Sequence, residues 1–85
     1  MTKEELLHSP NFMKLGQAIN HGSWQVAIMT VNKLQKDTRE AQVTEFDRQL
    51  TMIKTCVMGH KKTEALNALA ALVARRVSML NQGNE

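Results

Sequence analysis

The sequence predicts an all-α protein, an antiparallel up-and-down four-helix bundle preceded by a short N-terminal helical turn. Apolar residues recur at alternating steps of three and four through four segments, the spacing of one helix face. The chain has only one Pro and four Gly, and most of them stand between these segments. Its 85 residues are enough for one domain, so we expect residues 1–85 to form a single unit.

The first elements are marked by capping signals. Residues 2–5 (TKEE) have the capping-box spacing and predict a short turn that carries the next two leucines. Ser9 and Pro10 then suit the N-cap and first position of a helix. Gly22 suits the left-handed residue after that helix. The apolar stripe of this first long helix is Phe12, Leu15 and Ile19.

Three further helices follow, each with its own stripe. Ser23 is expected to cap the second helix, Gly59 to close the third, Thr63 or a neighbour to open the fourth, and residues 81–83 to end it. The second helix has the stripe Trp24, Ala27, Ile28, Val31 and Leu34. The third has Val43, Phe46, Leu50, Ile53 and Val57, and the fourth has Leu66, Leu69, Val73, Val77 and Leu80.

The junction between the second and third helices contains no Gly or Pro. The stripes on its two sides are out of phase by one residue, about 100° on a helix. A break between Asp37 and Thr44 accounts for this slip, and Thr44 with Asp47 resembles a capped start. One long bent helix is the alternative.

The chain also contains an internal echo. Residues 18–27 (AINHGSWQVA) resemble residues 56–65 (CVMGHKKTEA), each with a helix end, a polar turn containing Gly and a helix start. Two stacked helical hairpins would produce this pattern.

Catalytic and metal-binding patterns are absent from the sequence. His8, His21 and His60 fall before helices or in turns and lack a second ligand three or four residues away. Cys56, the single cysteine, allows no internal disulfide and is expected to be a buried, inert thiol. No phosphate loop or nucleophile motif occurs. We therefore expect neither an enzyme nor a metal or other cofactor.

Composition bounds the location and the partners. The N-terminus is not a signal peptide and no apolar run approaches a membrane span, so we expect a cytoplasmic protein. The net charge of +3 permits contact with an acidic protein or with nucleic acid, but no recognition motif supports nucleic acid. The six methionines are interpreted as core filling, with a flexible interface as the alternative.

Residues 19–24 (INHGSW), Ala27 and residues 31–37 (VNKLQKD) together resemble a histidine phosphotransfer domain of the two-component phosphorelays. The turn at Gly59 resembles the family's turn between its third and fourth helices. The resemblance implies an antiparallel four-helix bundle. It extends over nearly the whole chain, but the matching motifs are short ones that many helical hairpins share.

One residue departs from the pattern at its chemical centre. Asn32 stands where the family has its phospho-accepting histidine, and an amide cannot accept and return a phosphoryl group. Gln35, Lys36 and Asp37 stand where the family has Lys, Gly and Ser. The resemblance therefore implies a phosphotransfer-like fold without the transfer reaction, which could still bind a receiver domain or a kinase. The implied partner-binding residues are Asn32, Lys33, Gln35 and Lys36.

The sequence leaves the function open between two main hypotheses. The first is a non-catalytic interaction module in two-component signalling. The second is a helical assembly or chaperone-like protein of an unrelated family, which could form a homodimer. A small basic nucleic-acid binder is a third hypothesis.

Overall fold

The computed structural model describes residues 1–82, and every predicted segment within them is helical. No strand occurs in this part of the chain, so the all-α prediction is confirmed. The elements, in order, are α1 (Lys3–Leu7), α2 (Asn11–Asn20), α3 (Trp24–Ala41), the 3-10 turn η1 (Thr44–Phe46), α4 (Asp47–Met58) and α5 (Lys62–Gln82).

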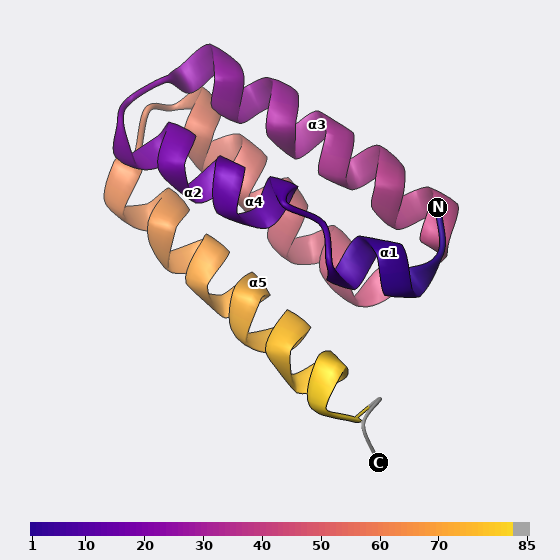
Figure 1. Cartoon of the computed structure of the whole chain (residues 1–85). Helices are drawn as coiled ribbons and strands as arrows, with labels where there is room; N and C mark the ends of the chain where they lie inside the picture. Colours follow the sequence, from indigo (N-terminus) through magenta and orange to yellow (C-terminus); the bar gives the residue numbers. More distant parts are fainter. Residues whose placement is uncertain (83–85) are drawn as a thin grey trace.

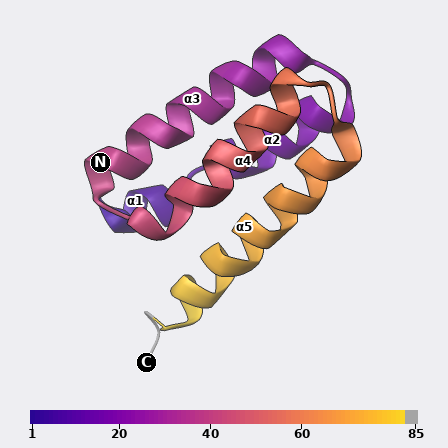
Figure 2. The same cartoon turned by 180° about the vertical axis from the view of Figure 1, so that it is seen from behind.

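The four long helices enclose one core. In both views α2 and α4 lie between α3 and α5 (Figure 1; Figure 2), and each of the outer two packs against both inner ones. The C-terminal half of α5 extends away from the other long helices, while α1 packs against α3 and α5. The large side chains with no exposure at all are Phe46, Leu6, Leu15, Ile19, Leu34, Leu50, Ile53, Leu72, Val31 and Val57.

Three helices end with the same hydrogen-bond pattern. In each case a residue two or three positions after the helix donates its N–H to a carbonyl five residues earlier, as in the Schellman motif. The donor–acceptor pairs are Ser23 to Ala18 at 2.8 Å, Val43 to Thr38 at 3.1 Å and Lys61 to Cys56 at 2.9 Å. The residue just before each donor is left-handed: Gly22 (φ 71°), Gln42 (φ 58°) and His60 (φ 55°).

These helix ends confirm one glycine prediction and correct another. Gly22 takes the left-handed conformation as expected. Gly59 does follow α4, but its φ is −88°, and the left-handed residue is the following His60. The left-handed residue is the one before the Schellman donor. Because the donor to the Cys56 carbonyl is Lys61, that residue is His60, one position after the glycine.

The junction between α3 and α4 is a true break. α3 ends at Ala41 and α4 begins at Asp47, so the alternative of one long bent helix is wrong. The reversal occurs at left-handed Gln42, inside the predicted interval. Thr44 does not cap α4. It lies in η1, and no side-chain hydrogen bond caps either η1 or α4.

Two other predicted caps are corrected in detail. α2 begins at Asn11, one residue later than expected, and the Ser9 hydroxyl accepts a hydrogen bond from the Asn11 N–H at 3.2 Å. Ser23 occupies the N-cap of α3, but its side chain makes no capping hydrogen bond. α5 begins at Lys62, next to the predicted Thr63. Gly83, predicted to help end the last helix, lies outside the described residues.

The internal echo corresponds to a structural repeat. When Ala18 is aligned with Cys56, left-handed Gly22 falls on left-handed His60, and the two turns make equivalent hydrogen bonds. The packing repeats too, because α2 and α3 contact each other as α4 and α5 do. Pairs of buried residues at the same offset are Phe12 and Leu50, Leu15 and Ile53, Ile19 and Val57, Ala27 and Ala65, Val31 and Leu69, and Leu34 and Leu72.

Arg76 connects three helices through one side chain. Its Nε donates a hydrogen bond to the carbonyl of Leu7, the last residue of α1. Its guanidinium also lies over the Phe12 ring of α2, 5.3 Å from the centroid, in cation–π geometry. Phe12 in turn meets Phe46 edge to face, with centroids 5.9 Å apart. The short helix α1 is therefore held by a residue far along the chain.

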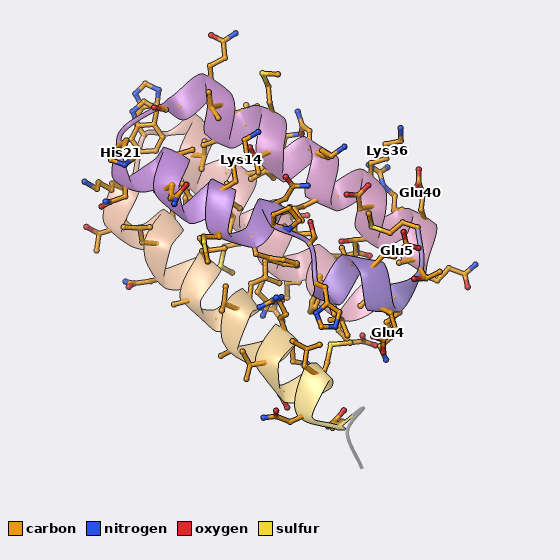
Figure 3. All side chains as sticks on the ribbon, in the orientation of Figure 1. Glu4, Glu5, Lys14, His21, Lys36 and Glu40 are labelled. Carbon is orange, nitrogen blue, oxygen red and sulfur yellow. The ribbon has the colours of Figure 1, made fainter. Side chains whose placement is uncertain are left out.

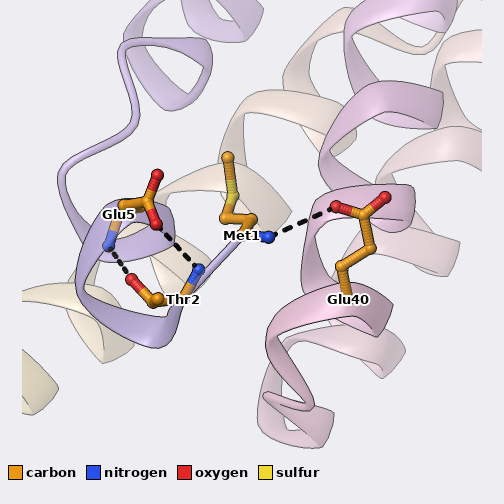
Figure 4. A network of polar contacts seen from close by, with 4 residues as sticks. All are labelled: Met1, Thr2, Glu5 and Glu40. Atoms are coloured by element: carbon orange, nitrogen blue, oxygen red, sulfur yellow. Dashed lines mark hydrogen bonds and ion pairs between the residues drawn. The ribbon is translucent and has the colours of Figure 1, made fainter.

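The N-terminal turn has the predicted capping box. The Thr2 hydroxyl accepts from the Glu5 N–H at 3.2 Å, and the Glu5 carboxylate accepts from the Thr2 N–H at 3.1 Å (Figure 4). The Thr2 backbone N–H, which donates to the carboxylate, is the main cause that holds the pKa of Glu5 below its usual value, and the Thr2 side chain adds to this effect. The Met1 ammonium lies 3.6 Å from the Glu40 carboxylate of α3, so the turn also contacts that helix.

Candidate functional site

The four predicted binding residues lie in the middle of α3. Asn32, Lys33 and Lys36 are exposed, and Gln35 is half-buried. Val31 and Leu34, which alternate with them, are completely buried. The amphipathic spacing of α3 thus turns Asn32 and Lys36 outward on the crest of the helix, and Figure 3 shows Lys36 pointing away from the bundle.

These four side chains do not form one pocket. Gln35 lines a hollow between α3 and α4, together with Arg39, Asp47 and Thr51. Lys33 lines a separate groove on the opposite flank of α3, against α2. Asn32 and Lys36 lie on the crest between the two. The predicted set is therefore one exposed helix face with a depression on each side.

The groove between α2 and α3 is lined by exposed apolar side chains and by lysines. Its lining residues, which define the α2–α3 groove below, are Asn11, Lys14, Val26, Met29, Thr30 and Lys33. Val26 is 42% exposed and Met29 is 65% exposed. The Thr30 hydroxyl donates to the Val26 carbonyl at 2.8 Å, so its donor is already satisfied within α3.

Sequence reasoning predicted only Lys33 of this groove and missed its other five lining residues, among them Lys14, Val26 and Met29. A signal for Met29 was present, because it stands outside the stripe that contains Ala27, Ile28 and Val31. An apolar residue on the polar face of a surface helix is a candidate contact for a partner. Lys14 carried no such signal, since only the packing of α2 against α3 brings it beside Lys33.

Basic residues predominate on α2 and on the exposed face of α3. Residues 6–36, which include all of α2 and most of α3, contain no Asp or Glu but contain Lys14, Lys33 and Lys36. The ion pairs within residues 1–82 are Met1 with Glu40 and His8 with Glu4, so none neutralises these lysines. The labelled acids Glu4, Glu5 and Glu40 gather instead at the α1 end of the bundle (Figure 3).

The interpretation of the methionines as core filling is wrong for most of them. Met79 is buried, but Met13, Met29 and Met58 are 73%, 65% and 64% exposed. Met52 is also exposed. The sequence placed these residues near the apolar stripes, whereas the helix rotation in the bundle turns their side chains to solvent. Exposed, flexible methionines are typical of adaptable binding surfaces.

Other chemically capable side chains do not converge. Within residues 1–82 no three His, Cys, Asp or Glu side chains are arranged to hold a metal ion. His60 stacks on Trp24 with centroids 4.8 Å apart, which joins the two equivalent turns at one end of the bundle. Cys56 is half-buried, so the expectation of a fully buried thiol is corrected.

None of the helices in residues 1–82 is both long and apolar enough to cross a membrane. Comparison of the chain with protein-family models, with curated proteins and with solved structures gives no match.

Proposed function

We propose that this chain is a non-catalytic protein-interaction module that binds its partner through the exposed face of α3 centred on Asn32. The observation that carries the proposal is that Asn32 and Lys36 occupy the crest of an 18-residue helix within a face that bears no exposed acid before Glu40. Such a face is available for contact along its whole length. Its exposed lysines favour an acidic partner surface.

The resemblance to histidine phosphotransfer domains gives the proposal its partner class. In this proposal the helices alternate in direction as an up-and-down bundle, the protein is cytoplasmic, and the partner is a receiver domain or kinase of two-component signalling. Asn32 then occupies the position of the phospho-accepting histidine. Because a carboxamide is a poor nucleophile and cannot shuttle a proton as imidazole does, the module binds without transferring phosphate.

Binding to purified receiver domains tests this proposal. We expect a complex that is weakened by Lys33→Glu and by Lys36→Glu. Lys54→Glu on α4 changes the net charge equally and serves as the control. Incubation with a phosphorylated receiver should leave no label on the chain. The proposal fails if no receiver or kinase domain binds, or if the control variant weakens binding as much as the α3 variants do.

A helical assembly protein that forms homodimers is the second candidate, and α5 favours it. Residues 65–82 contain no acid and only two charged residues, Arg75 and Arg76. Val77 is 44% exposed, and Ala70, Ala71 and Ala74 are exposed in the two turns before it. A helix that is largely apolar on both sides is typical of one covered on both sides. Sedimentation equilibrium tests this: a dimer that Val77→Asp converts to a monomer supports it, and a monomeric wild type contradicts it.

A further inference from the structure

The α2–α3 groove combines two properties that are found together nowhere else among the grooves described above. It exposes Val26 and Met29 of α3 to solvent, and it is also lined by Lys14 from α2 and Lys33 from α3. The lysines therefore come from two different helices. Leaving these apolar side chains in water has a free-energy cost that a partner would remove by covering them.

We propose that the occupant of this groove is an acidic amphipathic segment of a partner protein. An apolar side chain of the segment packs between Val26 and Met29, while its carboxylates pair with Lys14 and Lys33. This inference rests on the proposed function, because it names the partner chemistry for the same face of α3. Methionine suits this role since its unbranched side chain adapts to the shape that it meets.

Charge complementarity selects an acidic segment over a basic or neutral one. Residues 6–36 contribute three lysines and no carboxylate, and none of these lysines forms an ion pair within residues 1–82. The nearest acids along α3 are Asp37, which is buried, and Glu40, which pairs with the Met1 ammonium. A partner's carboxylates would meet this positive potential without competition, which raises the association rate as well as fixing orientation.

A second copy of the chain fits this groove poorly. Isologous pairing would put one lysine-lined groove against another, and like charges facing one another oppose association. Nucleic acid would pair with the lysines but would leave the apolar side chains of Val26 and Met29 uncovered. The groove also lacks an aromatic side chain on which a base could stack, since Trp24 is engaged with His60.

The test uses a synthetic peptide as the probe. It is a helical 16-residue peptide with Leu and Phe four residues apart and Glu on both flanks, and the matched peptide has Gln in place of every Glu. We expect the Glu peptide to shift the backbone amide resonances of Lys14, Val26, Met29 and Lys33 in the full chain. Binding measured by fluorescence anisotropy should weaken as salt is raised, and the Gln peptide should bind at least about tenfold more weakly.

Two double variants separate local charge from total charge. Lys14→Glu with Lys33→Glu, and Lys61→Glu with Lys62→Glu, each lower the formal net charge from +3 to −1. The groove variant should weaken binding of the Glu peptide by about tenfold or more, and the turn variant by less than about twofold. Met29→Gln keeps the charge and removes the apolar contact at an exposed position, so it should weaken binding while leaving the unfolding curve unchanged.

Several results would overturn the inference. Equal loss in the two double variants would mean that net charge alone drives binding. Resonance shifts confined to α5 or to the turns would place the peptide elsewhere. If the peptide does not bind but a DNA duplex binds with the same dependence on the lysines, the partner is a nucleic acid. The two proposals fail separately. Peptide binding without receiver binding rejects only the signalling role. Receiver binding that Lys33→Glu and Lys36→Glu weaken, in a chain that does not bind the Glu peptide, rejects only the acidic segment.

Discussion

At the scale of single residues, two glycines at helix ends differ in what an added methyl group would do. Gly22 has φ 71°, where an L-residue is strained by about 1–2 kcal/mol. Gly59 has φ −88°, and a Cβ there would meet the Thr55 carbonyl oxygen at 3.6 Å, an ordinary contact. Gly22→Ala should therefore lower the free energy of unfolding by about 1 kcal/mol. Gly59→Ala should leave it unchanged or raise it by about 0.4–1 kcal/mol, because the unfolded chain loses freedom.

Urea titrations of the two variants beside the wild type make this measurement. The comparison is matched, since both are Gly→Ala changes in equivalent turns of the internal repeat. Equal destabilisation by the two would contradict the assignment of the left-handed position to His60.

The residue scale is also where sequence reasoning was least complete. Gly22 could be predicted, because glycine is the default left-handed residue after a helix. Gln42 and His60 could not, because glutamine rarely takes φ near 55° and because Gly59, beside His60, is the better left-handed candidate by residue type. Their conformation follows from the hydrogen bonds of the next residue in each turn. The N–H groups of Val43 and Lys61 donate to the carbonyls of Thr38 and Cys56. The packing of the next helix determines that geometry, and the sequence of the turn alone does not contain it.

At the scale of elements, α1 depends on a contact made by α5. We predict that Arg76→Met lowers the free energy of unfolding by about 1.5–3 kcal/mol, because it removes a charge-assisted hydrogen bond to the Leu7 carbonyl and a cation–π contact with Phe12. Methionine preserves much of the side-chain volume, so the loss reports the polar contacts. Amide hydrogen exchange in α1 should accelerate more than exchange in α4.

Arg75→Met is the matched control, since Arg75 is the exposed neighbour on the same helix. It should change stability by less than about 0.5 kcal/mol. If both variants behave alike, Arg76 does not hold α1.

The capping box makes the stability of α1 depend on pH. The hydrogen bonds from Thr2 lower the folded pKa of Glu5 relative to 4.5 in the unfolded chain. A lowered carboxyl pKa adds stability above the unfolded value, and this stability is lost as pH falls through the folded value. We expect Glu5→Gln to speed exchange of the Leu6 amide at neutral pH, with the difference from wild type shrinking below pH 4.5. Glu45→Gln, in η1, should show no such effect on α1.

The break between α3 and α4 shows how far periodicity alone reaches at this scale. A phase slip of one residue located the break between Asp37 and Thr44, and α3 does end at Ala41. The start of α4 was predicted less well. Thr44 has the residue type of a cap, but Phe46 has to enter the core, and η1 positions its ring. Burial of that side chain overrides the local capping preference.

At the scale of the whole molecule, Phe46 is the largest completely buried side chain. It contacts Phe12 of α2, in the other half of the internal repeat. Phe46→Ala should lower the free energy of unfolding by about 3–5 kcal/mol through lost burial and the cavity left behind. A domain of this size has only roughly 4–13 kcal/mol in total, so thermal unfolding should shift markedly to lower temperature. Calorimetry measures the shift.

Met52→Ala provides the contrast, because Met52 is exposed on α4. It should change stability by no more than about 0.5 kcal/mol. A large loss on Met52→Ala, or a small one on Phe46→Ala, would contradict the description of the core.

The sequence by itself determined the helices, their apolar faces, the interval of the break and the internal repeat, because each depends on spacing along one chain segment. It also determined that Asn32 and Lys36 face outward, since both alternate with the buried stripe of α3. Only the tertiary structure decided that Lys14, Met29 and Lys33 line one groove and that Arg76 holds α1. These features depend on which side chains meet across helices, and helix periodicity carries no information about distances between segments.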